Sequence, residues 1–75
     1  MESEGKILSK SILTKREKEV FELLILNKTT KDIASILNIS EKTVRNHISN
    51  VMQKMNVKGR SGAIIELLKL GEINL

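Results

Sequence analysis

The chain contains no cysteine, no proline, no tryptophan and no tyrosine, and phenylalanine occurs once, as Phe21. Without cysteine it can form neither a disulfide nor a thiolate metal site, and a reducing compartment is compatible with it. No apolar run approaches the ~20 residues that a membrane-spanning helix needs. The first residues also lack the long apolar segment of a signal peptide. These absences predict a soluble, cytoplasmic, all-helical protein with a core of leucine, isoleucine, valine and methionine.

The positive charge of the chain is concentrated in its middle. The whole sequence has a net charge of +4, and residues 28–60 contain seven basic and two acidic groups. The remaining residues contain six basic and seven acidic groups. Such an excess on one segment is typical of a surface that meets a polyanion, and a solvated basic surface is the alternative.

Residues that start and end helices divide the chain into four helices. Thr14 with Glu17, and Thr29 with Asp32, form capping-box patterns, and Ser40 is a third N-cap. Asparagine follows each of the first three helices and glycine follows the fourth; both tolerate left-handed backbone. We therefore predict a flexible arm over residues 1–11 and one domain over residues 12–75. The predicted helices are 15–26, 30–37, 41–55 and a last one that begins at about 60 or 61 and ends at 70.

The third predicted helix has two unlike faces. Its apolar residues recur at helical spacing: Val44, Ile48, Val51, Met52 and Met55. The opposite face has no carboxylate and contains Lys42, Arg45, Asn46, Ser49 and Gln53. Together with the preceding helix and the short turn, this pattern predicts a helix-turn-helix whose second helix reads a DNA groove. A merely solvent-exposed polar face is the alternative.

The last predicted helix has more apolar surface than one small core can cover. Its apolar residues are Ala63, Ile64, Ile65, Leu67, Leu68 and Leu70. They span an arc of about 220°, against the ~100° of a helix that packs on one core. We therefore expect a second copy of the chain to pack on this helix. The alternative is that Ile7 and Leu8 of the arm fold back over it.

Residues 13–70 resemble the DNA-binding domain of the LuxR/FixJ family of bacterial transcription regulators. The matching residues are Leu13-Thr14, Arg16-Glu17, Ile33-Ala34, Ile39-Ser40, Thr43-Val44, His47, Lys54 and Arg60. One departure is Asn27, which stands where the family usually has glycine. The resemblance implies an all-α fold of four helices, a homodimer formed through the last helix, and transcription regulation. The segments "EKTVRNHISN", "MQK" and "VKGRS" are further similar to a short stand-alone regulator, which implies control of late sporulation (spore coat) genes in the mother cell.

The resemblance and the helix positions together give the candidate site residues. Family members read bases at the positions of Arg45, Asn46 and Ser49, and Asn50 lies beside them on the same helix. The expected phosphate contacts are Thr29, Lys31, Lys42, Thr43, Lys54, Lys58 and Arg60. For Lys54 and Arg60, packing of the aliphatic stem on the core is the alternative. The expected dimer interface contains Ile65, Leu68, Lys69 and Glu72.

No catalytic or metal-binding arrangement is recognisable in the sequence. The only histidine, His47, has no cysteine or carboxylate cluster near it in sequence, so we expect it to pack at the edge of the core. The three glutamates of the first predicted helix are surrounded by Lys15, Arg16 and Lys18. We expect no enzyme activity and no cofactor; the expected partners are double-stranded DNA, a second copy and RNA polymerase. The alternatives are a promoter-reading module like that of a sigma factor, and a helical protein-interaction module.

Overall fold

A computed structural model describes residues 12–74 of the chain, and this part consists of four α-helices without a strand. The helices are α2 (Lys15–Ile25), α3 (Thr30–Leu37), α4 (Glu41–Met55) and α5 (Arg60–Lys69). The predicted all-α class, the four helices and their order are confirmed. The predicted arm, with Ile7 and Leu8, lies outside the described residues.

The helix starts use the side chains that the sequence indicates. The Thr14 hydroxyl accepts a hydrogen bond from the Glu17 amide at 3.1 Å, and the Glu17 carboxylate accepts one from the Thr14 amide at 3.0 Å. Thr29 and Asp32 form the same reciprocal pair at the start of α3. The Ser40 hydroxyl accepts a hydrogen bond from the backbone amide at the third position of α4. These bonds satisfy amides that have no partner inside their helices.

The helix ends are closed by residues with left-handed backbone. Asn27, Asn38 and Asn56 have φ angles of 65°, 58° and 57°, and Gly71 has 74°. Each follows one of the four helices, as the sequence predicts. Asparagine adopts this conformation more readily than most residues with a side chain, because its short polar side chain bonds to nearby backbone.

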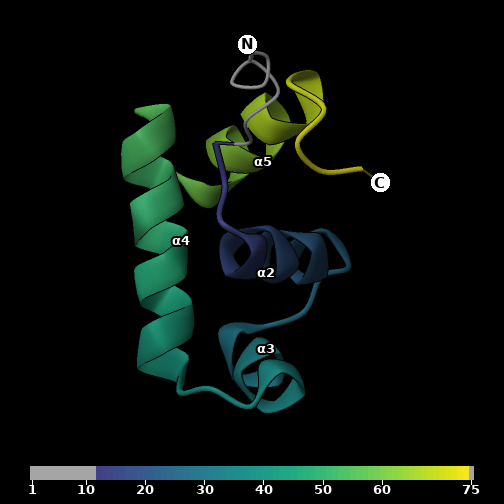
Figure 1. Ribbon diagram of the computed structural model, residues 1–75, viewed down its shortest axis with the longest axis vertical. Coiled ribbons are helices and arrows are strands. Elements are labelled where there is room, and N and C mark those ends of the chain that lie inside the picture. The colour runs from purple at the N-terminus through teal and green to yellow at the C-terminus, as the bar shows by residue number, and fades with distance from the viewer. Residues whose placement is uncertain (1–11, 75) are drawn as a thin grey trace, which may run out of the picture.

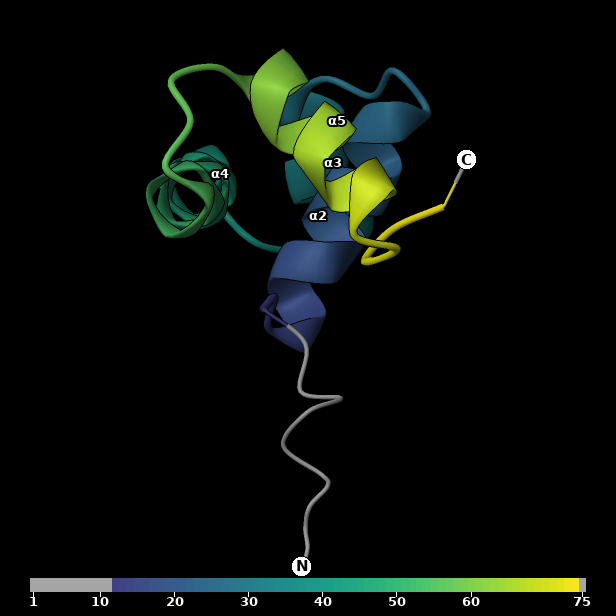
Figure 2. The same ribbon diagram turned by 90° about the horizontal axis from the view of Figure 1, so that it is seen from above.

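Helix α4 packs against all three other helices. In Figure 1 it stands along one side of the molecule, with α5, α2 and α3 beside it from top to bottom. Figure 2 views α4 almost end-on, with the other described helices all to one side of it. The buried apolar core between the helices consists of Leu13, Val20, Phe21, Ile33, Ala34, Val44, Ile48, Val51, Ala63, Leu67 and Ile73. One long face of α4 is therefore anchored, and the opposite face is uncovered by residues 12–74.

Helix α5 is only partly covered by the described residues. Ala63 and Leu67 are buried, whereas Ile65 and Leu70 are each 54% exposed. A uniformly buried helix would hide these two side chains as well. The wide apolar arc predicted from the sequence thus leaves large apolar side chains on the surface.

Candidate nucleic-acid interface

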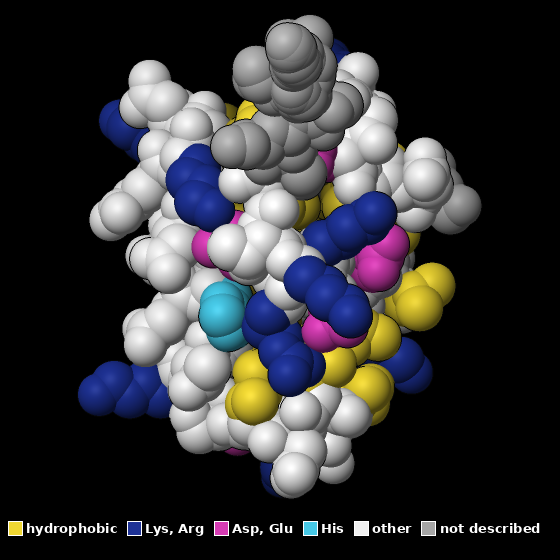
Figure 3. Space-filling model, in the orientation of Figure 1, with side chains coloured by type: hydrophobic (Ala, Val, Ile, Leu, Met, Phe, Trp, Pro, Cys, Tyr) yellow, Lys and Arg dark blue, Asp and Glu magenta, His cyan; other side chains and the backbone are white. Residues whose placement is uncertain are grey.

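The four predicted base-reading residues lie together on the uncovered side of α4. Arg45, Asn46, Ser49 and Asn50 are all exposed, while Val44, Ile48 and Val51 on the opposite side of the same helix are buried. Figure 3 shows mainly polar and basic side chains along the edge of the molecule that α4 forms. The helix thus presents amide, hydroxyl and guanidinium groups outward, which are the groups that bond to base edges in a major groove.

The turn before α4 gives the pair α3–α4 its helix-turn-helix geometry. Asn38 has left-handed backbone, and the Ile39 amide donates a hydrogen bond to the Ala34 carbonyl at 2.9 Å. Ile39 is half-buried against the core, and Ala34 is 8% exposed. A small residue at this position allows the two helices to approach closely. The left-handed Asn38, the Ile39–Ala34 hydrogen bond and the small Ala34 side chain therefore form the turn that leads into α4.

The predicted phosphate contacts fall into two groups in the structure. Four are exposed basic residues without an ion pair among residues 12–74: Lys31, Lys42, Lys58 and Arg60. The other three already have partners. The exposed Thr29 accepts a hydrogen bond from the Asp32 amide with its hydroxyl. Thr43 is half-buried and its hydroxyl lies 2.9 Å from the Ser40 hydroxyl, and Lys54 forms the ion pair described below. Thr29 and Thr43 lie at the starts of α3 and α4, where helix dipoles favour an anion.

A carboxylate that was not expected from the sequence lies beside the base-reading face. Glu41 Oε1 lies 3.4 Å from Arg45 Nη1, and the two side chains are 45% and 56% exposed. The residues are four positions apart, a spacing that places them on the same side of a helix. The expectation of a face without carboxylates was wrong, because that face was counted from Lys42 onward and Glu41 directly precedes it.

The ammonium of Lys54 is held by a buried carboxylate. Lys54 Nζ lies 2.5 Å from Glu17 Oε1 and donates a second hydrogen bond to the Ile12 carbonyl at 3.1 Å. Glu17 is 3% exposed and is the only buried charged residue of the described part. This pair was not predicted, although Glu17, Val20, Phe21 and Leu24 share one helical stripe. The structural contact of Lys54 is thus made by its ammonium group, whereas the alternative from the sequence concerned packing of its aliphatic stem.

The same contacts set the ionisation of Glu17. Burial acts to raise the pKa of its carboxyl group, but hydrogen bonds from Lys54 and from the Thr14 amide oppose this. The charges of Lys54 and His47 lower the pKa further, so it lies below its ordinary value. Glu17 is therefore a carboxylate at neutral pH, as its pairing with the lysine requires.

His47 is half-buried, in agreement with its expected place at the edge of the core. In Figure 3 the only histidine lies on the surface where α4 meets the neighbouring helices. No group of three or more histidine, aspartate or glutamate side chains within residues 12–74 has a geometry suited to a metal ion.

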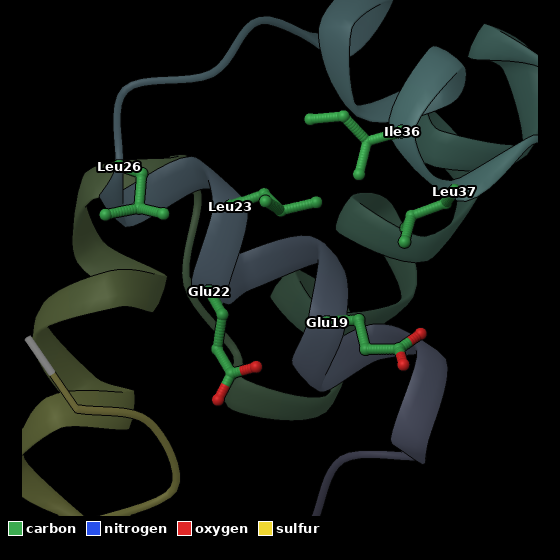
Figure 4. A pocket seen from close by; sticks show the side chains of 6 residues that line it. All are labelled: Glu19, Glu22, Leu23, Leu26, Ile36 and Leu37. Carbon is green, nitrogen blue, oxygen red and sulfur yellow. The ribbon is translucent and has the colours of Figure 1, made fainter.

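An open groove lies between α2 and α3, away from the outer side of α4. It has a volume of about 330 Å³ and is lined by Glu19, Glu22, Leu23, Leu26, Ile36 and Leu37 (Figure 4). Leu26 and Ile36 are 66% and 53% exposed. A surface of apolar side chains with two carboxylates repels phosphates, so this groove is unsuited to nucleic acid. The exposed, donor-rich helix of a helix-turn-helix instead defines the chain as a DNA-binding protein.

Comparison with known proteins identifies the family. Residues 11–67 match the bacterial regulatory proteins of the luxR family, and the chain belongs to this family. It is a helix-turn-helix regulator of transcription that binds DNA. Among the helices within residues 12–74, none has the length and apolar character that crossing a bilayer requires.

Two relatives and one solved structure show how far the similarity extends. The chain is 68% identical over 72 residues to the spore germination protein GerE of Bacillus subtilis (strain 168), covering 96% of this chain and 97% of that protein. A solved structure of the transcription factor GerE superposes with a TM-score of 0.85 at 62% identity, covering 87% of this chain and 97% of the other. The transcriptional regulatory protein DegU of Brevibacillus brevis is 47% identical over 64 residues, which is 85% of this chain but only 27% of DegU.

Proposed function

We propose that the protein binds two DNA half-sites as a homodimer and regulates late sporulation genes, including spore coat genes, in the mother cell of a spore former. The sporulation role is supported by 68% identity to the spore germination protein GerE over nearly the whole chain. Residues 12–75 act as one DNA-binding and dimerisation domain in the cytoplasm. A second copy, double-stranded DNA and RNA polymerase are the proposed partners, and no catalytic step or cofactor is involved.

The observation that supports this function most directly is the exposure of four polar side chains on an anchored helix. Arg45 can form two parallel hydrogen bonds to guanine O6 and N7, and Asn46 can form two to adenine N6 and N7. Ser49 and Asn50 lie one turn further along α4 and bond to bases or to flanking phosphates. The first turns of α4 enter the major groove, as in other helix-turn-helix proteins.

The phosphate contacts surround this helix. Lys31, Lys42, Lys58 and Arg60 approach the backbone of the duplex, while Thr29 and Thr43 donate their hydroxyls and neighbouring amides. Such contacts set the position of the protein on DNA and provide no sequence information by themselves. Lys54 has two partners within the protein and one remaining N–H donor, so its contribution to DNA affinity is the smallest of the proposed set.

Selection of bound duplexes from a random library tests the function and provides the half-site for later measurements. We expect enrichment of a motif that occurs twice, once for each protomer. On that site, Arg45→Ala should cost about 1–3 kcal/mol and relax the preference at one base pair. Lys58→Ala should weaken binding to all sequences alike. It should also reduce the magnitude of the slope of log K against log[salt] by about 1.

The outcomes that contradict the proposal are distinct. A library that yields no motif would leave the protein without sequence-specific recognition. Equal weakening of all sequences by Arg45→Ala would make Arg45 a phosphate contact. For the sporulation role, deletion of the gene in its host should reduce or raise late sporulation transcripts, and unchanged transcript levels would refute that part alone.

A further inference from the structure

Glu41 is the only carboxylate in the described part of the chain that is paired with a proposed base-reading residue. Its Oε1 lies 3.4 Å from Arg45 Nη1. The proposed phosphate contacts Lys31, Lys42 and Lys58 have no ion pair within residues 12–74. The guanidinium expected to read a base is thus constrained, whereas these three ammonium groups, unlike that of Lys54, are not.

The pairing leaves the guanidinium free to bind a base. Glu41 approaches one nitrogen, Nη1, while a guanidinium has five N–H donors. The edge formed by Nε and Nη2 therefore remains available for the two parallel hydrogen bonds to guanine. Glu41 precedes Arg45 by one helical turn, so it draws the guanidinium toward the end of α4 that enters the groove.

Stability of the fold does not account for this contact. Both side chains are about half exposed, and exposed ion pairs of this kind contribute little to folding. A carboxylate on this face also has a cost for DNA binding, because it repels phosphates whatever the sequence. Arginine, however, loses considerable side-chain freedom when it is fixed on a base, and a partner that restricts it beforehand reduces that loss.

We propose that Glu41 is a positioning residue that orients Arg45 and thereby sharpens the base preference at the pair that Arg45 reads. The inference rests on the proposed function of Arg45. It implies opposite effects of Glu41 on two measurable quantities. Glu41 lowers the affinity for DNA unrelated to the half-site, and it raises the ratio of the affinity for the preferred base pair to the affinity for its substitutes.

The test measures the DNA affinity of Glu41→Gln for the selected half-site and for duplexes that carry each substitution at the base pair that Arg45 reads. We expect affinity for unrelated DNA to rise on the order of twofold to fivefold at low salt, because one negative charge is removed. The discrimination ratio at that base pair should fall about fivefold or more. This loss is a part of the discrimination that one bidentate contact provides. Glu41→Asp, which restores the charge on a shorter side chain, should return unrelated-DNA affinity to normal without restoring the ratio.

Glu22→Gln is the matched control, because this substitution removes the same charge. Glu22 is an exposed glutamate on α2 without an ion pair in residues 12–74. It should change neither quantity by more than about twofold. An unchanged discrimination ratio in Glu41→Gln would overturn the proposal and leave only charge repulsion. If Arg45→Ala itself leaves the base preference intact, the proposed role of Arg45 fails, and that result is separate from the behaviour of Glu41.

Discussion

Glu17 and Lys54 join the first turn of α2 to the last turn of α4 through a single carboxylate oxygen. Glu17 Oε1 accepts a hydrogen bond from the Thr14 amide at 3.0 Å and one from Lys54 Nζ at 2.5 Å. The capping box of α2 and the end of the proposed reading helix therefore depend on the same side chain. Since 37 residues separate the two partners in the sequence, this contact is a tertiary one.

Replacement of this carboxylate should destabilise the fold. Glu17→Gln keeps an oxygen that can accept the Thr14 hydrogen bond, but it removes the charge that balances the Lys54 ammonium. Hydrogen bonds to charged groups contribute about 1.5–3 kcal/mol, and Lys54 is partly exposed and can regain water. We expect a loss of about 1–2 kcal/mol in the free energy of unfolding, measured by urea denaturation.

Glu22→Gln serves as the control for net charge, because it removes the same charge from an exposed residue of α2. Glu22 forms no ion pair within residues 12–74. Its effect should stay within about 0.5 kcal/mol. Equal losses in the two variants would show that the pair with Lys54 does not stabilise the fold.

The lowered pKa of Glu17 predicts a dependence of stability on pH. A carboxyl group with a lower pKa in the folded chain contributes stability that is complete above its unfolded pKa of about 4.3. That contribution is lost as the pH falls through the folded pKa, because the proton then binds in both states. The wild-type protein should therefore lose stability below about pH 5. Glu17→Gln should lose less over the same range.

Urea midpoints at several pH values between neutral and strongly acidic conditions measure this difference. The pKa of Asp32 is also lowered, by hydrogen bonds from Thr29, and this group is present in both proteins. The difference between the two curves thus isolates Glu17. Parallel curves for the wild type and the variant would refute the assignment.

The helices were predictable because their start and end signals are local. Thr14, Thr29 and Ser40 cap their helices with bonds that span three residues, and an asparagine closes each of the first three helices. A short stretch of sequence contains all that these contacts need. The orientation of α4, with Arg45 outward and Val44 inward, follows equally from the spacing of its apolar residues.

The ion pairs were not predicted, for two different physical reasons. Glu17 and Lys54 meet only when α2 and α4 pack, and no local pattern specifies which lysine approaches a given glutamate. The burial of Glu17 was nevertheless foreseeable from the helical stripe that it shares with Val20 and Phe21. Glu41 and Arg45 are four residues apart, a spacing that favours pairing on any helix. That pair was overlooked because the polar face was counted from Lys42 onward.

Self-association through α5 should depend on which exposed apolar residue is changed. Ile65 belongs to the proposed interface, whereas Leu70 lies outside it; each is 54% exposed. A glutamate in place of Ile65 introduces a charge that two copies would have to bury without a partner. We expect Ile65→Glu to sediment as a monomer at concentrations where the wild type is a dimer.

Leu70→Glu is the matched control, since it introduces the same charge at the same exposure on the same segment. It should remain a dimer by analytical ultracentrifugation. A monomeric wild type would exclude the proposed homodimer. If both variants dissociate alike, the interface would extend beyond the four proposed residues, which are Ile65, Leu68, Lys69 and Glu72.

The left-handed backbone at Asn38 predicts an unusual order of substitutions. Its φ of 58° strains most residues with a Cβ, by about 1–2 kcal/mol, while glycine adopts it freely. Asn38→Ala should therefore lower the free energy of unfolding by about 1 kcal/mol, and Asn38→Gly should change it by less than about 0.5 kcal/mol. Urea denaturation of both variants measures the two values.

Asn50→Ala is the control for loss of an asparagine side chain, because Asn50 is exposed in the middle of α4 with helical backbone. Alanine is the better helix former there, so this variant should be as stable as the wild type or slightly more stable. If alanine at position 38 were as well tolerated as glycine, the turn between α3 and α4 would not require left-handed backbone. The direction of the reading helix would then depend on core packing through Ile39 and Ala34 alone.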